Sequence, residues 1–121
     1  NCSTVDFSNA GLYLSDGTKL LTLSVGNQIG FTVSQFNSVT SFNSTPLSAN
    51  IGSFTVGVPL ILRINDNGTN NIFGVSVNGV DFTTVSQART SWLTATKVGY
   101  FANANNTTTY AAIRMINWKQ T

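Results

Sequence analysis

The sequence contains very little charge, and this scarcity limits the kinds of partner the protein can bind. Only 8% of its 121 residues are charged, against about 25% in an average soluble domain. The formal net charge is +2, and the six basic residues are scattered along the chain without forming a basic run. Recognition of a phosphate backbone needs lysine and arginine side chains clustered on one surface. We therefore expect no nucleic-acid partner.

The shortage of acid–base groups argues against an enzyme. Glycoside hydrolysis in its common form needs two carboxyl groups about 5–9.5 Å apart. The chain has no histidine and no glutamate, and no two of its aspartates are placed by the sequence to act as a pair. A serine or cysteine nucleophile would also lack its usual general base. We therefore expect no catalytic residue. The chain's four acidic residues are Asp6, Asp16, Asp66 and Asp81.

Metal-binding and membrane-spanning signals are missing as well. Cys2 is the single cysteine, so it cannot form an internal disulfide and is expected to be a free thiol. Residues 66–71 supply oxygen ligands of the kind Ca²⁺ prefers, but they lack acidic residues at alternate positions, and an ordinary turn rich in Asx residues is the expected structure. No apolar run approaches 18 residues. We expect no metal, no cofactor and no membrane insertion.

Asparagine, serine and threonine take the place of the missing charge and together account for 45 residues. Hydrophobic residues make up 41% of the chain, which is too many for a disordered protein. The length is sufficient for one two-layer core, so we expect residues 1–121 to form a single β-sandwich domain. The chain begins directly with Asn-Cys-Ser-Thr and shows no signal peptide. We expect it to be one module of a longer polypeptide, or a matured product.

The clearest strand signals lie between Gly57 and Val85. Apolar residues alternate over 58–64, which predicts a strand with one buried face made by Val58, Leu60, Leu62 and Ile64 and the opposite face made by Pro59, Ile61 and Arg63.

Two further strands, 72–77 and 80–85, flank Asn78-Gly79, the preferred pair for a two-residue type I′ turn. That turn predicts the pairs Val77 with Val80, Val75 with Phe82, and Phe73 with Thr84.

Short alternating segments bounded by turn residues recur along the rest of the chain. Residues 34–50 are rich in serine, asparagine and threonine, and we expect a less regular segment there with at most one short strand. In 86–96, Gln87 to Arg89 suit a helical turn, and Trp92-Leu93 is expected to close one end of the core. Strands every 8–12 residues, without a sustained 3.6-residue period, predict an all-β, antiparallel sandwich or barrel. Further strands are expected within 5–15, 19–25, 29–33, 51–56, 97–102 and 109–118.

The segment 57–118 resembles the C-terminal half of a concanavalin A-like lectin/glucanase jelly roll. Members of that family often show a leucine-arginine strand, a serine-x-aspartate-glycine-x-x-aromatic hairpin and a valine-glycine-aromatic strand, in this order. Here Asn78 stands in the place of the usual acidic turn residue. The resemblance implies an antiparallel two-sheet jelly-roll sandwich, a fold that serves sugar-binding modules, glycoside hydrolases and structural domains. The matching segments are PLILRI at 59–64, SVNGVDF at 76–82, VGYFA at 98–102 and NW at 117–118.

Sugar binding is the sharpest functional hypothesis. Saccharide sites are largely preformed and combine an aromatic face with a few amide or guanidinium donors. On the predicted last strand, Tyr110, Arg114 and Trp118 project to one side. Ser76 and Asp81 offer polar groups on the reverse face of the hairpin, and all five would form a binding floor if they share one concave sheet. The alternative is that the two aromatic residues belong to a core or interface and that the arginine is simply solvated.

The composition also resembles that of bacteriophage tail-fibre and other virion modules. We therefore expect a non-catalytic domain that binds a glycan or a glycosylated cell-surface receptor, located extracellularly or on the virion surface. The rival hypothesis is a structural decoration or assembly domain whose outward aromatic residues are buried against neighbouring copies, for example in a homotrimer. A degenerate hydrolase is a third hypothesis.

Overall fold

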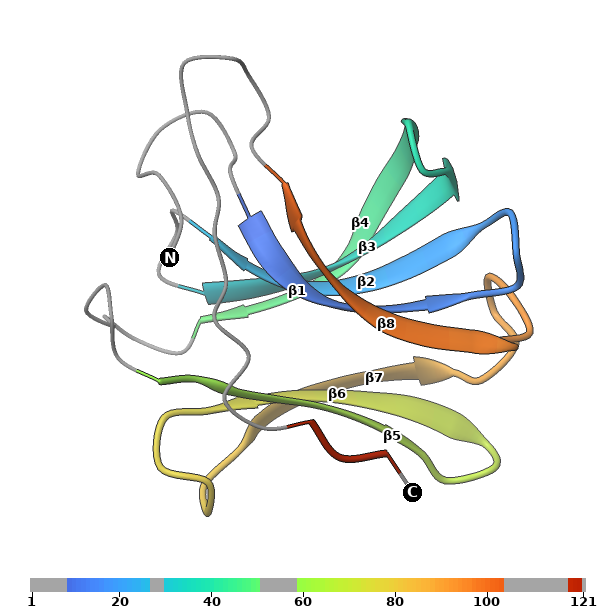
Figure 1. Ribbon diagram of the computed structural model, residues 1–121. Helices are drawn as coiled ribbons and strands as arrows, with labels where there is room; N and C mark the ends of the chain where they lie inside the picture. Colours follow the sequence, from blue (N-terminus) through green and yellow to red (C-terminus); the bar gives the residue numbers. More distant parts are fainter. Residues whose placement is uncertain (1–8, 27–29, 51–58, 104–117, 121) are drawn as a thin grey trace.

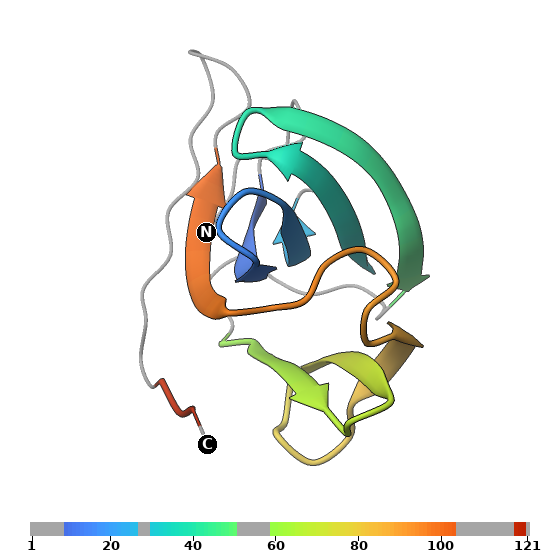
Figure 2. The same ribbon diagram turned by 90° about the vertical axis from the view of Figure 1, so that its right-hand side faces the viewer.

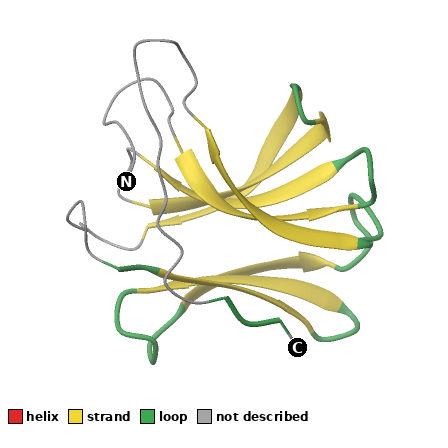
Figure 3. Cartoon of the chain, viewed as in Figure 1, coloured by secondary structure: helices red, strands yellow, loops and turns green. Residues whose placement is uncertain are grey.

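The computed structural model describes residues 9–26, 30–50, 59–103 and 118–120, and all regular structure in these segments is β-strand. Figure 3 shows strands joined by loops, with no helix among the described residues. No helix long and apolar enough to cross a membrane therefore occurs in these segments. The strands are β1 (Asn9–Ser15), β2 (Leu20–Gly26), β3 (Gly30–Ser38), β4 (Ser41–Asn50), β5 (Ile61–Asp66), β6 (Asn70–Ser76), β7 (Thr83–Ala88) and β8 (Lys97–Asn103).

The strands form two antiparallel sheets that lie one over the other (Figure 1). The larger sheet has the order β4-β3-β2-β1-β8, and the smaller one has the order β5-β6-β7. The prediction of an all-β protein with two antiparallel sheets is therefore confirmed. In the larger sheet, β1 to β4 lie side by side in the order in which they occur in the sequence. The last strand, β8, pairs with the free edge of β1. The predicted strand at 51–56 and all but Trp118 of the predicted strand at 109–118 lie outside the described residues, so jelly-roll connectivity stays a prediction.

The hydrophobic core lies between the two sheets. Leu60, Leu62 and Ile64 point toward it, and Ile61 and Arg63 are exposed, as the alternation over 58–64 predicts. The larger sheet supplies four of the buried side chains and the smaller sheet two, because every second residue of each strand faces the other sheet. The buried cluster consists of Leu21, Leu23, Phe31, Val33, Phe73, Val75 and Leu93.

The loop after β7 closes one end of this core, as predicted for Trp92-Leu93. Leu93 is buried, and Trp92 packs against the cluster while its indole Nε1 donates a hydrogen bond to the Leu20 carbonyl at 3.1 Å. The Lys19 ammonium lies 4.6 Å from the centre of the Trp92 ring. The helical turn considered for 87–89 does not form, because β7 continues through Ala88.

The interpretation of residues 34–50 as a loose segment is wrong. β3 continues to Ser38 and pairs with β4, which runs as far as Asn50. Asparagine and proline are depleted in strands, which weakens the signal here. The pairing instead uses side-chain hydroxyls, with Ser34 Oγ 3.0 Å from Thr45 Oγ1. Pro46 is accommodated because β4 is an edge strand of the described sheet, where a missing N–H costs no ladder hydrogen bond.

The register of the β6–β7 hairpin differs from the predicted one by one residue. Phe73 pairs with Val85, not with Thr84, and Gly74 pairs with Thr84. A one-residue slip moves a strand's side chains to the opposite face. As a result Val85 packs against the core, and Phe82 lies on the outer side of the sheet near Gly74.

The side chains of the connecting loop explain the slip. Ser76 Oγ accepts hydrogen bonds from the N–H groups of Asn78 and Gly79 at 3.2 and 2.9 Å. Asn78 Oδ1 in turn accepts from the N–H groups of Val80 and Asp81 at 2.8 and 2.9 Å. These bonds form a wider loop over 77–82 in place of a two-residue turn. Gly79 keeps the positive φ, 79°, that the Asn-Gly signal predicts.

The larger sheet is strongly curled (Figure 2), and β8 pairs with β1 along its whole length. The Tyr13 ring of β1 lies over Gly99 of β8, where a Cβ atom would come within 2.7 Å of the ring. Only glycine leaves room for the ring at this place. The next residue, Tyr100, consequently points to the opposite face of the sheet.

The observed register can be tested with a matched pair of variants. Val85→Ala should lower the free energy of unfolding by about 1–2 kcal/mol, because it removes methyl groups packed against Phe73. Thr84→Ala, on the outer face, should change it by less than about 0.5 kcal/mol. Urea unfolding followed by tryptophan fluorescence measures both. A larger loss of unfolding free energy for Thr84→Ala than for Val85→Ala would instead support the register predicted from a two-residue turn.

Candidate functional site

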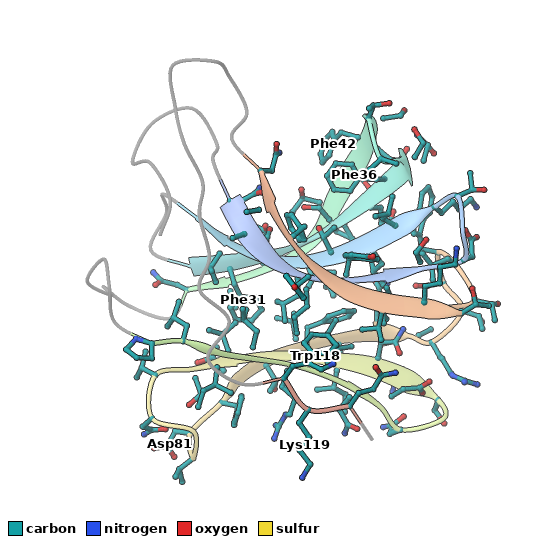
Figure 4. All side chains as sticks on the ribbon, in the orientation of Figure 1. Phe31, Phe36, Phe42, Asp81, Trp118 and Lys119 are labelled. Atoms are coloured by element: carbon teal, nitrogen blue, oxygen red, sulfur yellow. The ribbon has the colours of Figure 1, made fainter. Side chains whose placement is uncertain are left out.

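Tyr100 and Trp118 form an exposed aromatic pair at the open side between the two sheets. Their ring centroids are 6.0 Å apart, with an interplanar angle of 56°. The exposed fractions are 55% for Tyr100 and 40% for Trp118, so neither ring is part of the core. Figure 4 shows Trp118 between the ribbons of β8 and β5. Two tilted rings with accessible faces offer a preformed apolar contact surface.

The register of β8 explains why Tyr100 faces this opening. Tyr100 pairs with Leu12 of β1, which pairs with Leu23 of β2, and Leu23 is fully buried in the core. Tyr100 therefore lies on the inner face of the larger sheet. Among the described residues, that sheet has five strands and the sheet opposite has three, and Tyr100 lies on β8 at the margin of the wider sheet. An inward-facing residue can remain accessible only at such a margin.

The two other predicted site residues that the structure describes, Ser76 and Asp81, are not gathered around this pair. Ser76 is 2% exposed, and its hydroxyl is already used by the loop: it accepts two N–H bonds and donates to Asn78 Oδ1 at 3.0 Å. Asp81 is exposed, and its Oδ2 accepts a hydrogen bond from Asn78 Nδ2 at 3.0 Å. In Figure 4, Asp81 lies at the tip of the 77–82 loop, well away from Trp118. Tyr110 and Arg114 lie outside the described residues.

Sequence reasoning missed Tyr100 as the partner of Trp118. The valine-glycine-aromatic segment at 98–100 was recognised as a strand, and alternation placed Tyr100 on the same side as Val98. The signal available in the sequence is a tyrosine directly after a strand glycine, Gly99, and this pattern does not reveal how far the opposite sheet extends. That extent decides the accessibility of the ring.

The turn at 66–71 is a hydrogen-bonded Asx turn. Asp66 Oδ1 accepts the Gly68 N–H at 2.8 Å, and Asn67 Oδ1 accepts the N–H groups of Thr69 and Asn70 at 3.0 and 2.7 Å. Asp66 Oδ2 accepts Arg89 Nε at 2.6 Å. These side-chain oxygens of Asp66 and Asn67 thus already accept hydrogen bonds, from the turn itself or from Arg89. Among the described residues, no group of three or more histidine, cysteine or acidic side chains is positioned to hold a metal ion.

A small cavity lies beside this turn and is too small for a sugar. Its volume is about 20 Å³, which is room for roughly one water molecule. The Asn71 side chain reaches it from β6 and donates a hydrogen bond to the Arg89 carbonyl at 3.3 Å. The candidate site is therefore the exposed aromatic pair and not this cavity, which is lined by Asp66, Asn71, Arg89, Thr90, Thr94 and Ala95.

Comparisons with protein-family models, with curated proteins and with solved structures found no match. The resemblance to concanavalin A-like jelly rolls therefore rests on the short segments quoted above, and the function has to be argued from the geometry of the described residues.

The role of Ser76 can be separated from ligand binding. Ser76→Ala leaves the N–H groups of Asn78 and Gly79 without their acceptor and should lower the free energy of unfolding by about 1–3 kcal/mol. Ser86→Ala, at an exposed position of β7, should change it by less than about 0.5 kcal/mol. Thermal unfolding followed by circular dichroism compares the two variants. Equal stability of both would show that the Ser76 hydroxyl does not hold the loop.

Two carboxyl groups should make the stability depend on pH in the acid range. Backbone N–H groups of Thr18 and Lys19 hold the pKa of Asp16 below its ordinary 3.8, and the Gly68 N–H, followed by Arg89, does the same for Asp66. A carboxyl with a lower pKa in the folded state stabilises the fold above pH 3.8, and this contribution disappears as the pH falls through the folded-state pKa. Urea unfolding at a series of pH values should therefore show a decrease in stability below pH 3.8 that is shallower in the Asp16→Asn, Asp66→Asn double variant. An equally steep decrease in the double variant would contradict this assignment.

Proposed function

We propose that this chain is a non-catalytic carbohydrate-binding module that holds a saccharide against the Tyr100–Trp118 pair. The observation that supports the proposal is the accessibility of both rings, 55% and 40%, at the margin of the larger described sheet. The flat C–H faces of a sugar ring can pack on such aromatic surfaces. Tyrosine and tryptophan combine this apolar area with a polar group at the edge of the ring.

The surroundings of the aromatic pair favour a hydroxyl-rich ligand. Lys119 and Gln120, next to Trp118, are exposed and offer an ammonium and an amide group. The chain as a whole carries only 8% charged residues, so its surface polarity comes mainly from amides and hydroxyls. Such groups exchange hydrogen bonds with sugar hydroxyls without the desolvation cost of a buried charge.

The positions of the described carboxyl groups support binding without cleavage. Asp16, Asp66 and Asp81 lie in three different turns, and each accepts at least one hydrogen bond there. None of them adjoins the Tyr100–Trp118 pair in the described structure. A glycosidase of the common type would need two carboxyl groups on either side of the bound sugar.

The wider setting is part of the same proposal. We place the module in a concanavalin A-like jelly-roll sandwich, at the receptor-binding end of a bacteriophage tail fibre or another virion appendage. Its partner there is a glycan or a glycosylated receptor on the host surface. The two-sheet architecture, the short matching segments of 59–118 and the richness in asparagine, serine and threonine support this setting.

A specific observation favours the rival function of an assembly domain. Val39 and Phe42, at the turn between β3 and β4, are 82% and 60% exposed, and Val80 in the loop 77–82 is 81% exposed. The Phe42 ring packs edge-on against Phe36 at 5.6 Å, which holds it in place at the surface. Apolar side chains presented in this way are typical of contacts with neighbouring copies. Light scattering after size exclusion distinguishes a stable trimer from a monomer.

The two tryptophans provide a matched test of the proposed site. Trp118→Ala should weaken saccharide binding about tenfold, since the loss of a ring contact is worth about 1.4 kcal/mol, and should leave the melting temperature nearly unchanged. Trp92→Ala removes an indole that packs against the core and should lower stability, with little effect on binding at temperatures where the variant is folded. A glycan array identifies the ligand, and isothermal titration calorimetry compares the variants.

The results distinguish the two functions. Binding to at least one glycan that is lost in Trp118→Ala supports the carbohydrate-binding module. A stable trimer in solution with no glycan bound on the array would instead support the assembly domain. Glycan binding that is unaffected by Trp118→Ala and Tyr100→Ala would show that the aromatic pair is not the site.

A further inference from the structure

The outer face of the smaller sheet presents an arginine in an unusual setting. Arg63 of β5 pairs with Gly74 of β6, which pairs with Thr84 of β7, so these three residues form one row across the sheet. Their neighbours Leu62 and Val75 face the core, and the row therefore faces away from it. Both Arg63 and Thr84 are exposed.

The Arg63 guanidinium lies over the Phe82 ring, with its central carbon 3.9 Å from the ring centroid. Gly74 makes this possible, because a Cβ atom at that position would lie 3.2 Å from Phe82 Cδ1. The observed register of the β6–β7 hairpin brings Phe82 to this face. Stacking on an aromatic ring restricts a long side chain, so the guanidinium is oriented before any ligand binds.

This guanidinium has no counter-ion in the part of the chain that the structure describes. The ion pair found there joins Arg89 to Asp66, and no described side chain or carbonyl accepts a hydrogen bond from Arg63. Arginine presents its N–H donors in a planar fork that matches the two oxygens of a carboxylate. An oriented, unpaired fork at the surface is therefore suited to a carboxylate from outside the chain.

We infer that Arg63, stacked on Phe82, binds the carboxylate of an acidic saccharide such as a uronic acid. The exposed residues on the same face of the sheet favour a sugar over an acidic peptide. Asn65 lies two residues along β5, and Thr84 and Ser86 lie across from it on β7, so an amide and two hydroxyls accompany the charge. This second site does not depend on the Tyr100–Trp118 pair and adds selectivity for acidic ligands.

A pair of ligands that differ only in charge tests the inference. Trigalacturonic acid and its methyl ester have the same sugar rings, but the ester has no carboxylate. The acid should bind the protein about tenfold more tightly than the ester in isothermal titration calorimetry at low salt, since a charge-assisted hydrogen bond is worth about 1.5–3 kcal/mol. Added salt should weaken the binding of the acid more than that of the ester.

Single-residue variants show which side chain is responsible for the preference for the acid. Arg63→Gln should abolish the preference for the acid, and Arg63→Lys should reduce it, because lysine keeps the charge but loses the planar fork. Arg89→Gln removes the same charge from a residue already paired with Asp66 and should leave the preference unchanged. Trp118→Ala should weaken the binding of the ester, which offers Arg63 no carboxylate, whereas Arg63→Gln should not, so the failure of one site can be told from the failure of the other.

Three results would overturn the inference. The first is equal affinity for the acid and the ester. The second is an equal loss of preference in Arg63→Gln and Arg89→Gln, which would indicate a general effect of net charge. The third is binding of tri-aspartate as tight as that of trigalacturonic acid, which would show that the site recognises carboxylates without regard to the sugar. A circular dichroism spectrum and melting curve for each variant confirm that it is folded.

Discussion

Apolar contact between the inner faces of the two sheets is the interaction on which the described structure depends. Phe31 from the larger sheet and Phe73 from the smaller one are 1% and 0% exposed. Burial of a side chain of this size is worth about 1.5–3 kcal/mol. The ion pair between Arg89 and Asp66 is exposed and contributes little by comparison. With so few charges in the chain, the hydrophobic effect has to supply most of the stability.

This contact also decides where the candidate binding residues are presented. Tyr100 lies on the same face of its sheet as the core residues and is accessible on β8, at the margin of the larger described sheet. Arg63 alternates with the core-facing residues of β5 and is accessible because it faces away from the core. One candidate site thus uses the margin of the inner face, and the other uses an outer face. Both are surface patches supported by regular strands, which hold their side chains in defined positions.

The abundance of asparagine, serine and threonine has a structural role that composition alone does not reveal. Ser76, Asn78 and Asn67 accept backbone N–H groups within turns, and the hydroxyls of Ser24 and Thr32 lie 3.0 Å apart on neighbouring strands. Side chains of this kind replace the charged groups that usually satisfy exposed turns. Many of them are therefore already engaged, and only a subset is free to meet a ligand. The richness in amides and hydroxyls is as much a means of folding as a sign of sugar binding.

The sequence by itself determined the strand character of most of the described chain, the inward and outward residues of β5, and the closing role of Trp92-Leu93. These features depend on alternation and local turn chemistry, which neighbouring residues control. Only the tertiary structure decided the register of β6 and β7, because burial of Val85 and the side-chain hydrogen bonds of the 77–82 loop together outweigh the preference for a two-residue Asn-Gly turn. It also decided that Tyr100 meets Trp118 and that Phe82 supports Arg63. Alternation assigns a residue to a face, but the width of the opposing sheet and the pairing of distant strands determine what that residue touches.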